Sequence, residues 1–237
     1  MPGSTSRIEV YLEVGKNRAF AGAIDWPGWC RSGRDEADAL ASLFGYGDRY
    51  ALALRGSRLG FRVPKEASSL EVVERLRGTS TTEFGAPDVS PSRDGRPVDD
   101  EELERFRALL RASWRAFDQA VSSARGKTLR RGPRGGGRTL GEIVQHVAGA
   151  EQAYLGRIGW RTMNAGGGSL PKTELTRPRQ AILQALSAAV RGELPSKGPR
   201  GGRLWSPRYF VRRVSWHALD HAWEIEDRVG KNIWPKR

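Results

Sequence analysis

The chain contains one cysteine, Cys30, among its 237 residues. A single cysteine excludes an internal disulfide framework and a zinc site built from several thiolates, so imidazole and carboxylate groups are the remaining metal ligands. It also fits a reducing compartment. The sequence has no apolar run of 18 residues, which excludes a predicted membrane-spanning helix, and residues 1–6 lack the pattern of a secretory signal. We therefore expect a cytoplasmic protein.

Histidine is almost as scarce, with three in the whole chain: His146, His217 and His221. Two histidines four residues apart on a helix lie one above the other, with Cβ atoms roughly 6 Å apart, which suits two imidazoles that bind one metal ion. His146 lies in a different helical segment, so all three meet if the two helices pack side by side. The alternative is three core histidines, each with its own hydrogen-bond partner.

Acidic residues are too few to balance the basic ones, and the formal net charge is +13. Residues 1–98 are nearly neutral, whereas residues 99–237 carry most of the excess. Two stretches without any acidic residue, 125–138 and 195–213, hold six basic residues each. Such a field attracts anions, either nucleic acid or an acidic small substrate. The alternative is a solvated surface in a chain that uses arginine far more often than lysine.

The first third of the chain predicts a small α+β module, residues 1–78. Residues 8–14 alternate as a half-buried strand does, and residues 18–25 follow a short turn as the second strand of a hairpin. The other expected elements are a short strand at 29–31 after the Pro27-Gly28 turn, a helix from Asp35 as N-cap to Leu54 that bends at Gly45 and Gly47, and a strand at 70–76.

Residues 79–98 contain three prolines and show no periodicity, so we expect a linker or an arm that lies over one of the domains. Phe84 is the only large apolar side chain that is available to anchor it.

Residues 99–237 predict a four-helix bundle, because four long amphipathic segments follow one another with clear caps. The expected helices are Asp99 to Ala124, Thr139 to about Arg161, Thr176 to Pro195, and Ser206 to about Val229. Residues 162–175 are long enough for a crossover connection. In the last helix, His217 and His221 fall on the apolar stripe, where a shared divalent ion would satisfy neutral imidazoles better than separate hydrogen bonds.

Three segments closely resemble the DinB-like (damage-inducible) family: Gly137-Arg138-Thr139, residues 143–151 around His146, and residues 216–224 around the histidine pair. The resemblance spans about residues 99–230. It implies a four-helix bundle in which His146, His217 and His221 hold a divalent metal. Characterised relatives include metal-dependent thiol S-transferases and isomerases that use low-molecular-weight thiols, beside many members without a known activity.

The N-terminal module resembles the HicB-like antitoxin fold in its order of hairpin, Pro-Gly turn, short strand, helix and strand. The segments that carry this resemblance are Tyr11-Leu12-Glu13, residues 20–24, Pro27-Gly28-Trp29-Cys30 and residues 33–40. No ribbon-helix-helix or helix-turn-helix pattern accompanies it. We therefore prefer a module for protein contact or homodimerisation over an antitoxin.

The expected function is a metal-dependent enzyme, a hydrolase or a thiol S-transferase or isomerase, which activates water or a thiol at an open coordination position for a small-molecule substrate. Zn, Ni, Fe and Mn are not distinguished. Carboxylates that could orient a ligand or act as a general base, unless they are exposed or in salt bridges, are Glu142, Glu151, Asp220 and Glu224. Arg134 and Arg138 are expected to guide an anion. The alternative is a non-catalytic protein that binds a partner or nucleic acid and holds a structural metal.

Overall fold

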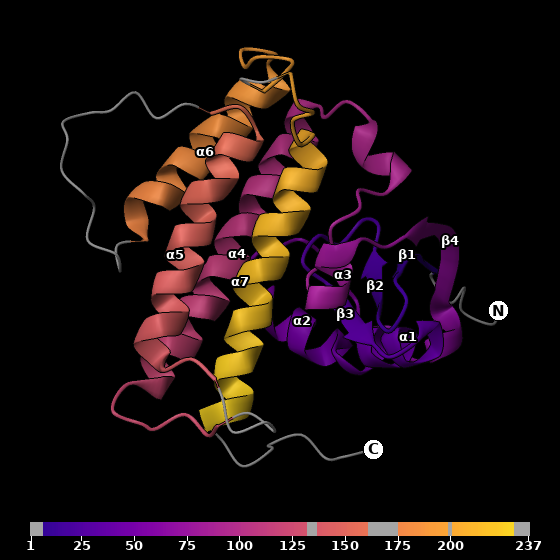
Figure 1. Cartoon of the computed structure of the whole chain (residues 1–237), viewed down its shortest axis with the longest axis vertical. Coiled ribbons are helices and arrows are strands. Elements are labelled where there is room, and N and C mark those ends of the chain that lie inside the picture. The colour runs from indigo at the N-terminus through magenta and orange to yellow at the C-terminus, as the bar shows by residue number, and fades with distance from the viewer. Residues whose placement is uncertain (1–6, 132–136, 161–174, 199–200, 230–237) are drawn as a thin grey trace.

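The computed structural model describes residues 7–131, 137–160, 175–198 and 201–229. One side of the molecule contains a four-stranded sheet together with the short helices, and the other side contains a bundle of long helices (Figure 1). None of the helices in the described ranges combines the length and apolar character that a membrane span requires.

The sheet has the order β3-β2-β1-β4. Its strands are β1 (Ile8–Val14), β2 (Ala19–Ala23), β3 (Cys30–Gly33) and β4 (Leu70–Arg77). β1 and β2 form the predicted antiparallel hairpin, β3 extends it, and β4 pairs parallel with β1. The strand content predicted from alternation is therefore confirmed.

The helix predicted after Asp35 is divided in two, α1 (Glu36–Gly45) and α2 (Gly47–Ala53), at the glycine pair that was expected to bend it. Asp35 is the N-cap, because its Oδ1 accepts the backbone N–H of Asp38 at 2.8 Å. A 3-10 turn, η1 (Ala67–Ser69), precedes β4.

The arm at residues 79–98 contains a short helix, α3 (Ser80–Phe84), and a 3-10 turn, η2 (Ser92–Gly95). The prediction that Phe84 anchors this arm is wrong, since its side chain is 93% exposed. Polar contacts hold the arm instead. The buried carboxylate of Glu13 accepts the backbone N–H groups of Asp88 and Val89 at 2.9–3.0 Å, so backbone hydrogen bonds fasten this part of the arm to β1.

The bundle consists of α4 (Asp100–Ala124), α5 (Leu140–Arg157), α6 (Thr176–Val190) and α7 (Pro207–Val229). All four predicted starts are confirmed to within a residue. α5 and α6 end earlier than predicted because Gly159 and Gly192, at φ 85° and 71°, take the left-handed conformation that follows a helix C-terminus. The predicted crossover at 162–175 lies almost entirely outside the described residues.

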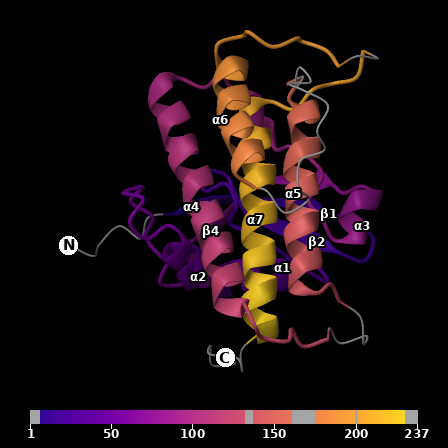
Figure 2. The ribbon, with the colours of Figure 1, turned by 90° about the vertical axis from the view of Figure 1, so that its left-hand side faces the viewer.

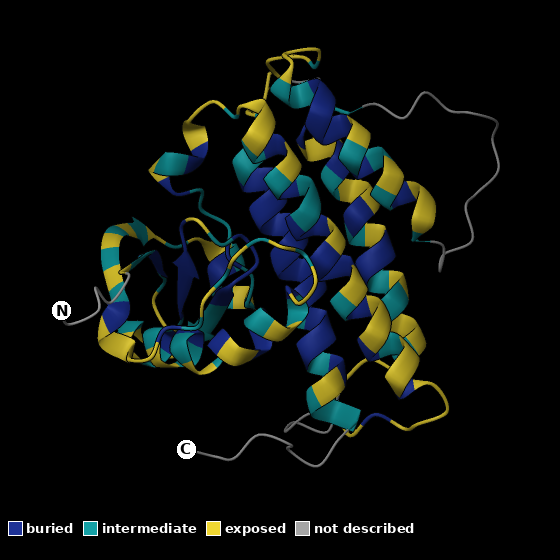
Figure 3. Cartoon of the chain, turned by 180° about the vertical axis from the view of Figure 1, so that it is seen from behind, coloured by how far each residue is buried: buried dark blue, intermediate teal, exposed yellow. Residues whose placement is uncertain are grey.

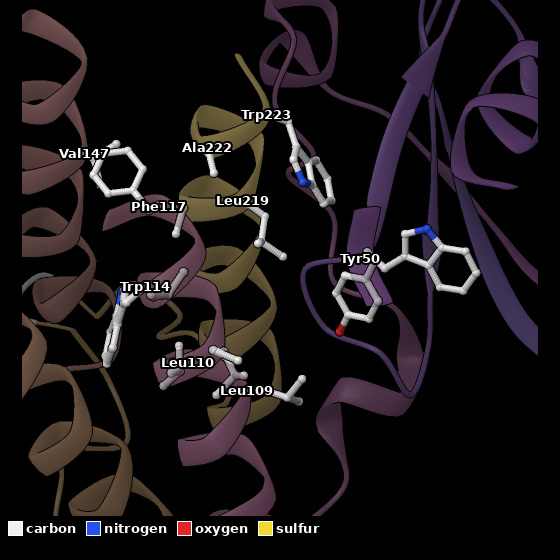
Figure 4. Packing of buried hydrophobic residues seen from close by; sticks show 14 of the residues in the cluster. Tyr50, Leu109, Leu110, Trp114, Phe117, Val147, Leu219, Ala222 and Trp223 are labelled. Carbon is white, nitrogen blue, oxygen red and sulfur yellow. The ribbon is translucent and has the colours of Figure 1, made fainter. Parts of the chain in front are cut away.

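α7 lies at the centre of the molecule, between the other bundle helices and the sheet module (Figures 1 and 2). Burial follows this arrangement, since α7 is buried along most of its length (Figure 3). Leu219 and Trp223 lie on the side of Tyr50, whereas Phe117 and Val147 lie on the bundle side of the same helix (Figure 4). These residues belong to one continuous apolar core, so both faces of α7 are covered and its side chains have restricted positions.

Candidate metal centre

The three histidines of the chain meet where α5 packs against α7. One ring nitrogen of each, from His146, His217 and His221, lies within 4.8 Å of the other two. The Nε2 atoms of His146 and His217 are 3.1 Å apart, and the three ring centroids are 4.7–5.0 Å from one another. The structure thus brings together the three residues that the sequence singled out.

Burial favours the neutral form of an imidazole, which is the form that binds a metal ion. His217 and His221 are 6% and 8% exposed. Burial lowers the pKa of His217 well below its usual value, and the neighbouring histidines lower it further. Burial also lowers the pKa of His146. A neutral imidazole has one ring nitrogen with a free lone pair that can bind a metal. Three such nitrogens close together fit a divalent ion, whose positive charge would offset the repulsion between their lone pairs.

Glu224 fixes the ring of His221. The Nδ1 atom of His221 lies 2.7 Å from Oε2 of Glu224, and Nη1 of Arg228 donates to the other oxygen at 2.6 Å. Burial raises the pKa of Glu224, but the hydrogen bonds from His221 and Arg228 outweigh burial and leave it below its usual value. A carboxylate on Nδ1 keeps the proton there and leaves the Nε2 lone pair free for a metal.

Asp220 and Glu142 have structural partners, and in the described part of the chain neither forms a hydrogen bond with a histidine. Asp220 accepts from Nη1 of Arg31 at 2.7 Å, an ion pair that joins β3 to α7. The exposed carboxylate of Glu142 closes the capping box of α5 by accepting the backbone N–H of Thr139 at 2.7 Å. The expectation that either residue orients an imidazole therefore has no contact to support it.

Glu151 points away from the histidines, toward α4 and α6. It is 1% exposed, and neither of its oxygens has a hydrogen-bond partner in the described part of the chain. Its nearest cation is Nε of Arg179, at 3.6 Å. Burial raises the pKa of Glu151 to about 7. Five residues after His146, it lies on another face of α5 and forms a separate polar pair inside the bundle.

The two arginines expected to guide an anion have different outcomes. Arg134 lies outside the described residues. Arg138 is exposed, and its positive charge is among the influences that lower the pKa of His146, after burial, so it lies close enough to affect the cluster.

The second acid-free stretch is less of a basic surface than its composition indicates. Arg208 forms an ion pair with Glu102, and Arg212 is buried against Asp94. Arg213 is buried as well, at 7% exposed. These three side chains are used inside the molecule, which removes half of the six charges that an anionic polymer was expected to contact.

Two residues beside the cluster were missed as functional candidates. The ring centroid of Tyr154 lies 5.8 Å from that of His217, and Arg213 precedes His217 by one turn of α7. Helical spacing carries the signal in both cases, since Tyr154 follows His146 by eight residues and Arg213 precedes His217 by four.

A four-helix bundle with a largely buried cluster of three imidazoles on two adjacent helices defines the class of helical proteins that can hold a divalent metal inside the bundle. Residues 109–225 match the model of the DinB superfamily. The helical part of the chain belongs to this superfamily. No curated protein and no solved structure matches the chain. The match does not include the sheet module, whose likeness to the HicB-like fold stays a prediction.

Proposed function

We propose that this protein is an enzyme that depends on a divalent metal ion held by His146, His217 and His221. The observation that carries the proposal is the convergence of three imidazole nitrogens within 4.8 Å. Three protein ligands leave a coordination position for water or a substrate atom, as in catalytic zinc sites. Zn²⁺, Ni²⁺, Fe²⁺ and Mn²⁺ all accept imidazole, so metal supply would select the ion.

A bound divalent ion would lower the pKa of water or of a thiol at the open position. The protein's own residues provide the surroundings. Glu224 keeps the Nδ1 proton of His221 in place, the ring of Tyr154 covers one side of His217, and the charge of Arg138 favours an anionic substrate.

We assign the reaction to the hydrolase or thiol S-transferase and isomerase class. Cys30 does not supply a nucleophile, because it is 2% exposed and burial raises the pKa of its thiol to about 12. Any thiol that reacts at the centre would therefore come from solution as a low-molecular-weight cofactor.

Titration of purified, EDTA-treated protein with Co²⁺ or Zn²⁺ in a calorimeter tests the metal site. We expect one ion per chain and an affinity at least 100-fold lower in His217→Ala, because one of three ligands is lost. Ser215→Ala is the matched control, since Ser215 is equally buried on α7 but offers no imidazole. Equal stoichiometry and affinity in His217→Ala and the native protein would overturn the proposal.

The Co²⁺-loaded protein also separates the two reaction classes. A small thiol that enters the open position gives a sulfur-to-cobalt charge-transfer band in the near ultraviolet, which we expect for a transferase or isomerase. If visible and near-ultraviolet spectra stay unchanged with thiols but respond to pH through bound water, the hydrolase assignment stands. A spectrum that responds to neither would contradict an open position.

A further inference from the structure

Arg213 is a buried cation without a carboxylate partner in the described part of the chain. Its Nη1 donates to the carbonyl oxygen of Pro87, and its Nε has no acceptor. The neighbouring Arg212 differs sharply, since Asp94 accepts from its Nε and Nη2 at 2.7–2.8 Å and two backbone carbonyls accept from its Nη1 and Nη2. A buried guanidinium without a counter-charge is unfavourable, so Arg213 requires a function that Arg212 does not.

Two more buried donors without acceptors lie within one turn of Arg213. They are Nε1 of Trp216, whose indole can only donate, and Nδ1 of His217, which carries the proton when Nε2 binds a metal. Each buried donor left without an acceptor destabilises the folded protein. Three such donors on one helical turn indicate that an acceptor-rich group binds here.

Aromatic rings surround the guanidinium. Its central carbon lies 5.0 Å from the ring centroid of Trp216 and 5.8 Å from those of Tyr154 and Trp205. Tyr154 also contacts the ring of His217, so one aromatic side chain connects Arg213 to the histidine cluster. Rings around a cation favour a ligand that has a charged end and an apolar body.

We infer that Arg213 is the anchor of a subsite for a small organic carboxylate beside the metal centre. The carboxylate accepts hydrogen bonds from Arg213 and Trp216, and the apolar body of the ligand lies against Tyr154 and Trp205. This inference rests on the proposed function, because it names the substrate class of that centre. Arg213 would hold the anion itself, because it adds burial and aromatic contacts to its charge, whereas the exposed Arg138 would attract the anion from solution.

Binding of benzoate to EDTA-treated protein tests the subsite without any metal. We expect tryptophan fluorescence to report saturable binding, at least tenfold weaker for benzamide, which has the same shape without the charge. Arg213→Gln should weaken benzoate binding at least tenfold and leave benzamide unaffected. The control Arg203→Gln removes the same charge from an exposed position close to Trp205, and it should bind benzoate within twofold of the native protein.

Equal benzoate affinity in Arg213→Gln, or equal binding of benzoate and benzamide by the native protein, would overturn the inference. If Arg213→Gln does not fold, a measurement on the native protein tests the inference. The indole N–H resonance of Trp216, identified by its loss in Trp216→Phe, must shift with benzoate, and a resonance that stays in place means that the donors hold only ordered water. Because metal is absent, failure of this subsite is distinct from failure of the metal centre.

Discussion

At the residue scale, the proposed ligand His221 depends on a neighbour on its own helix. Glu224 holds its Nδ1 at 2.7 Å, and a neutral amide is a weaker acceptor than a carboxylate. We expect Glu224→Gln to weaken Zn²⁺ binding by about 10- to 100-fold, the typical effect of losing a group that orients a ligand. Calorimetric titration measures this loss, and circular dichroism checks that the helices stay folded.

Asp220→Asn is the matched control, because Asp220 lies on the same helix and pairs with Arg31 at 2.7 Å. This substitution should lower the melting temperature slightly and leave Zn²⁺ affinity unchanged, as expected for a partly exposed ion pair. If both variants weakened metal binding equally, the effect would reflect loosening of α7, and the orienting function assigned to Glu224 would be wrong.

The sequence could predict the three histidines, because their spacing and the apolar stripe of α7 are local patterns. It could not assign the carboxylates. Glu151 lies near Arg179 of α6, Glu224 lies beside His221, and Asp220 accepts from Arg31, 189 residues earlier. Partners so distant in sequence leave no local pattern, so competition for a side chain is visible only in three dimensions.

At the element scale, Glu151 links the stability of the bundle to pH. Burial between α4, α5 and α6 raises its pKa from 4.5 to about 7. The folded state therefore holds this proton more tightly than the unfolded state does. The resulting stabilisation is complete below about pH 4.5 and is lost as pH rises through about 7, and its size is roughly 3 kcal/mol.

We expect Glu151→Gln, which is neutral at every pH, to remove this dependence. The difference in unfolding free energy between the variant and the native protein should grow in favour of the variant from pH 5 to pH 8 in urea titrations. Asp118→Asn, which changes an exposed carboxylate beside Arg179, should show a much smaller change. A difference between Glu151→Gln and the native protein that is constant over this range would contradict the raised pKa.

Helix starts and helix ends were not equally predictable. Capping residues such as Asp99 and Thr139 determine a start by a hydrogen bond within three residues, and both bonds are present. The predicted end of α5 is too late because apolar residues continue beyond it, and the predicted end of α6 is too late because it relied on Pro195 as the stop signal. Gly159 and Gly192 end these helices. Glycine can adopt both helical and left-handed backbone conformations, so packing decides which one it takes.

At the scale of the whole molecule, α7 unites the two parts of the chain. Trp216 packs edge-on against Phe20 at a centroid distance of 6.3 Å, and Trp223 packs in the same manner against Tyr46 at 5.0 Å. Both tryptophans are therefore contacts between α7 and the sheet module. The helix that carries two histidines on one face is thus fixed by the sheet module on the other.

This arrangement could not be predicted from composition. Arg212 lies in a stretch without acidic residues, which favours an exposed basic surface. It is instead 4% exposed, and its counter-charge comes from Asp94 in an arm that has no periodicity of its own. Local pattern defines the elements on each side of α7, whereas the contacts between them join residues far apart in sequence, as Arg212 and Asp94 do across 118 positions.

Asp94→Asn tests whether this pair holds the sheet module against the bundle. The substitution leaves Arg212 buried without a counter-charge, and we expect a loss of about 3–5 kcal/mol in unfolding free energy. Asp88→Asn is the control, because its side chain accepts from Thr79 at an exposed position of the same arm, and it should cost under about 1 kcal/mol. Urea denaturation measures both. Since α7 carries His217 and His221, Asp94→Asn should also weaken Zn²⁺ binding in the folded protein, whereas equal stability of the two variants would show that the arm does not secure α7.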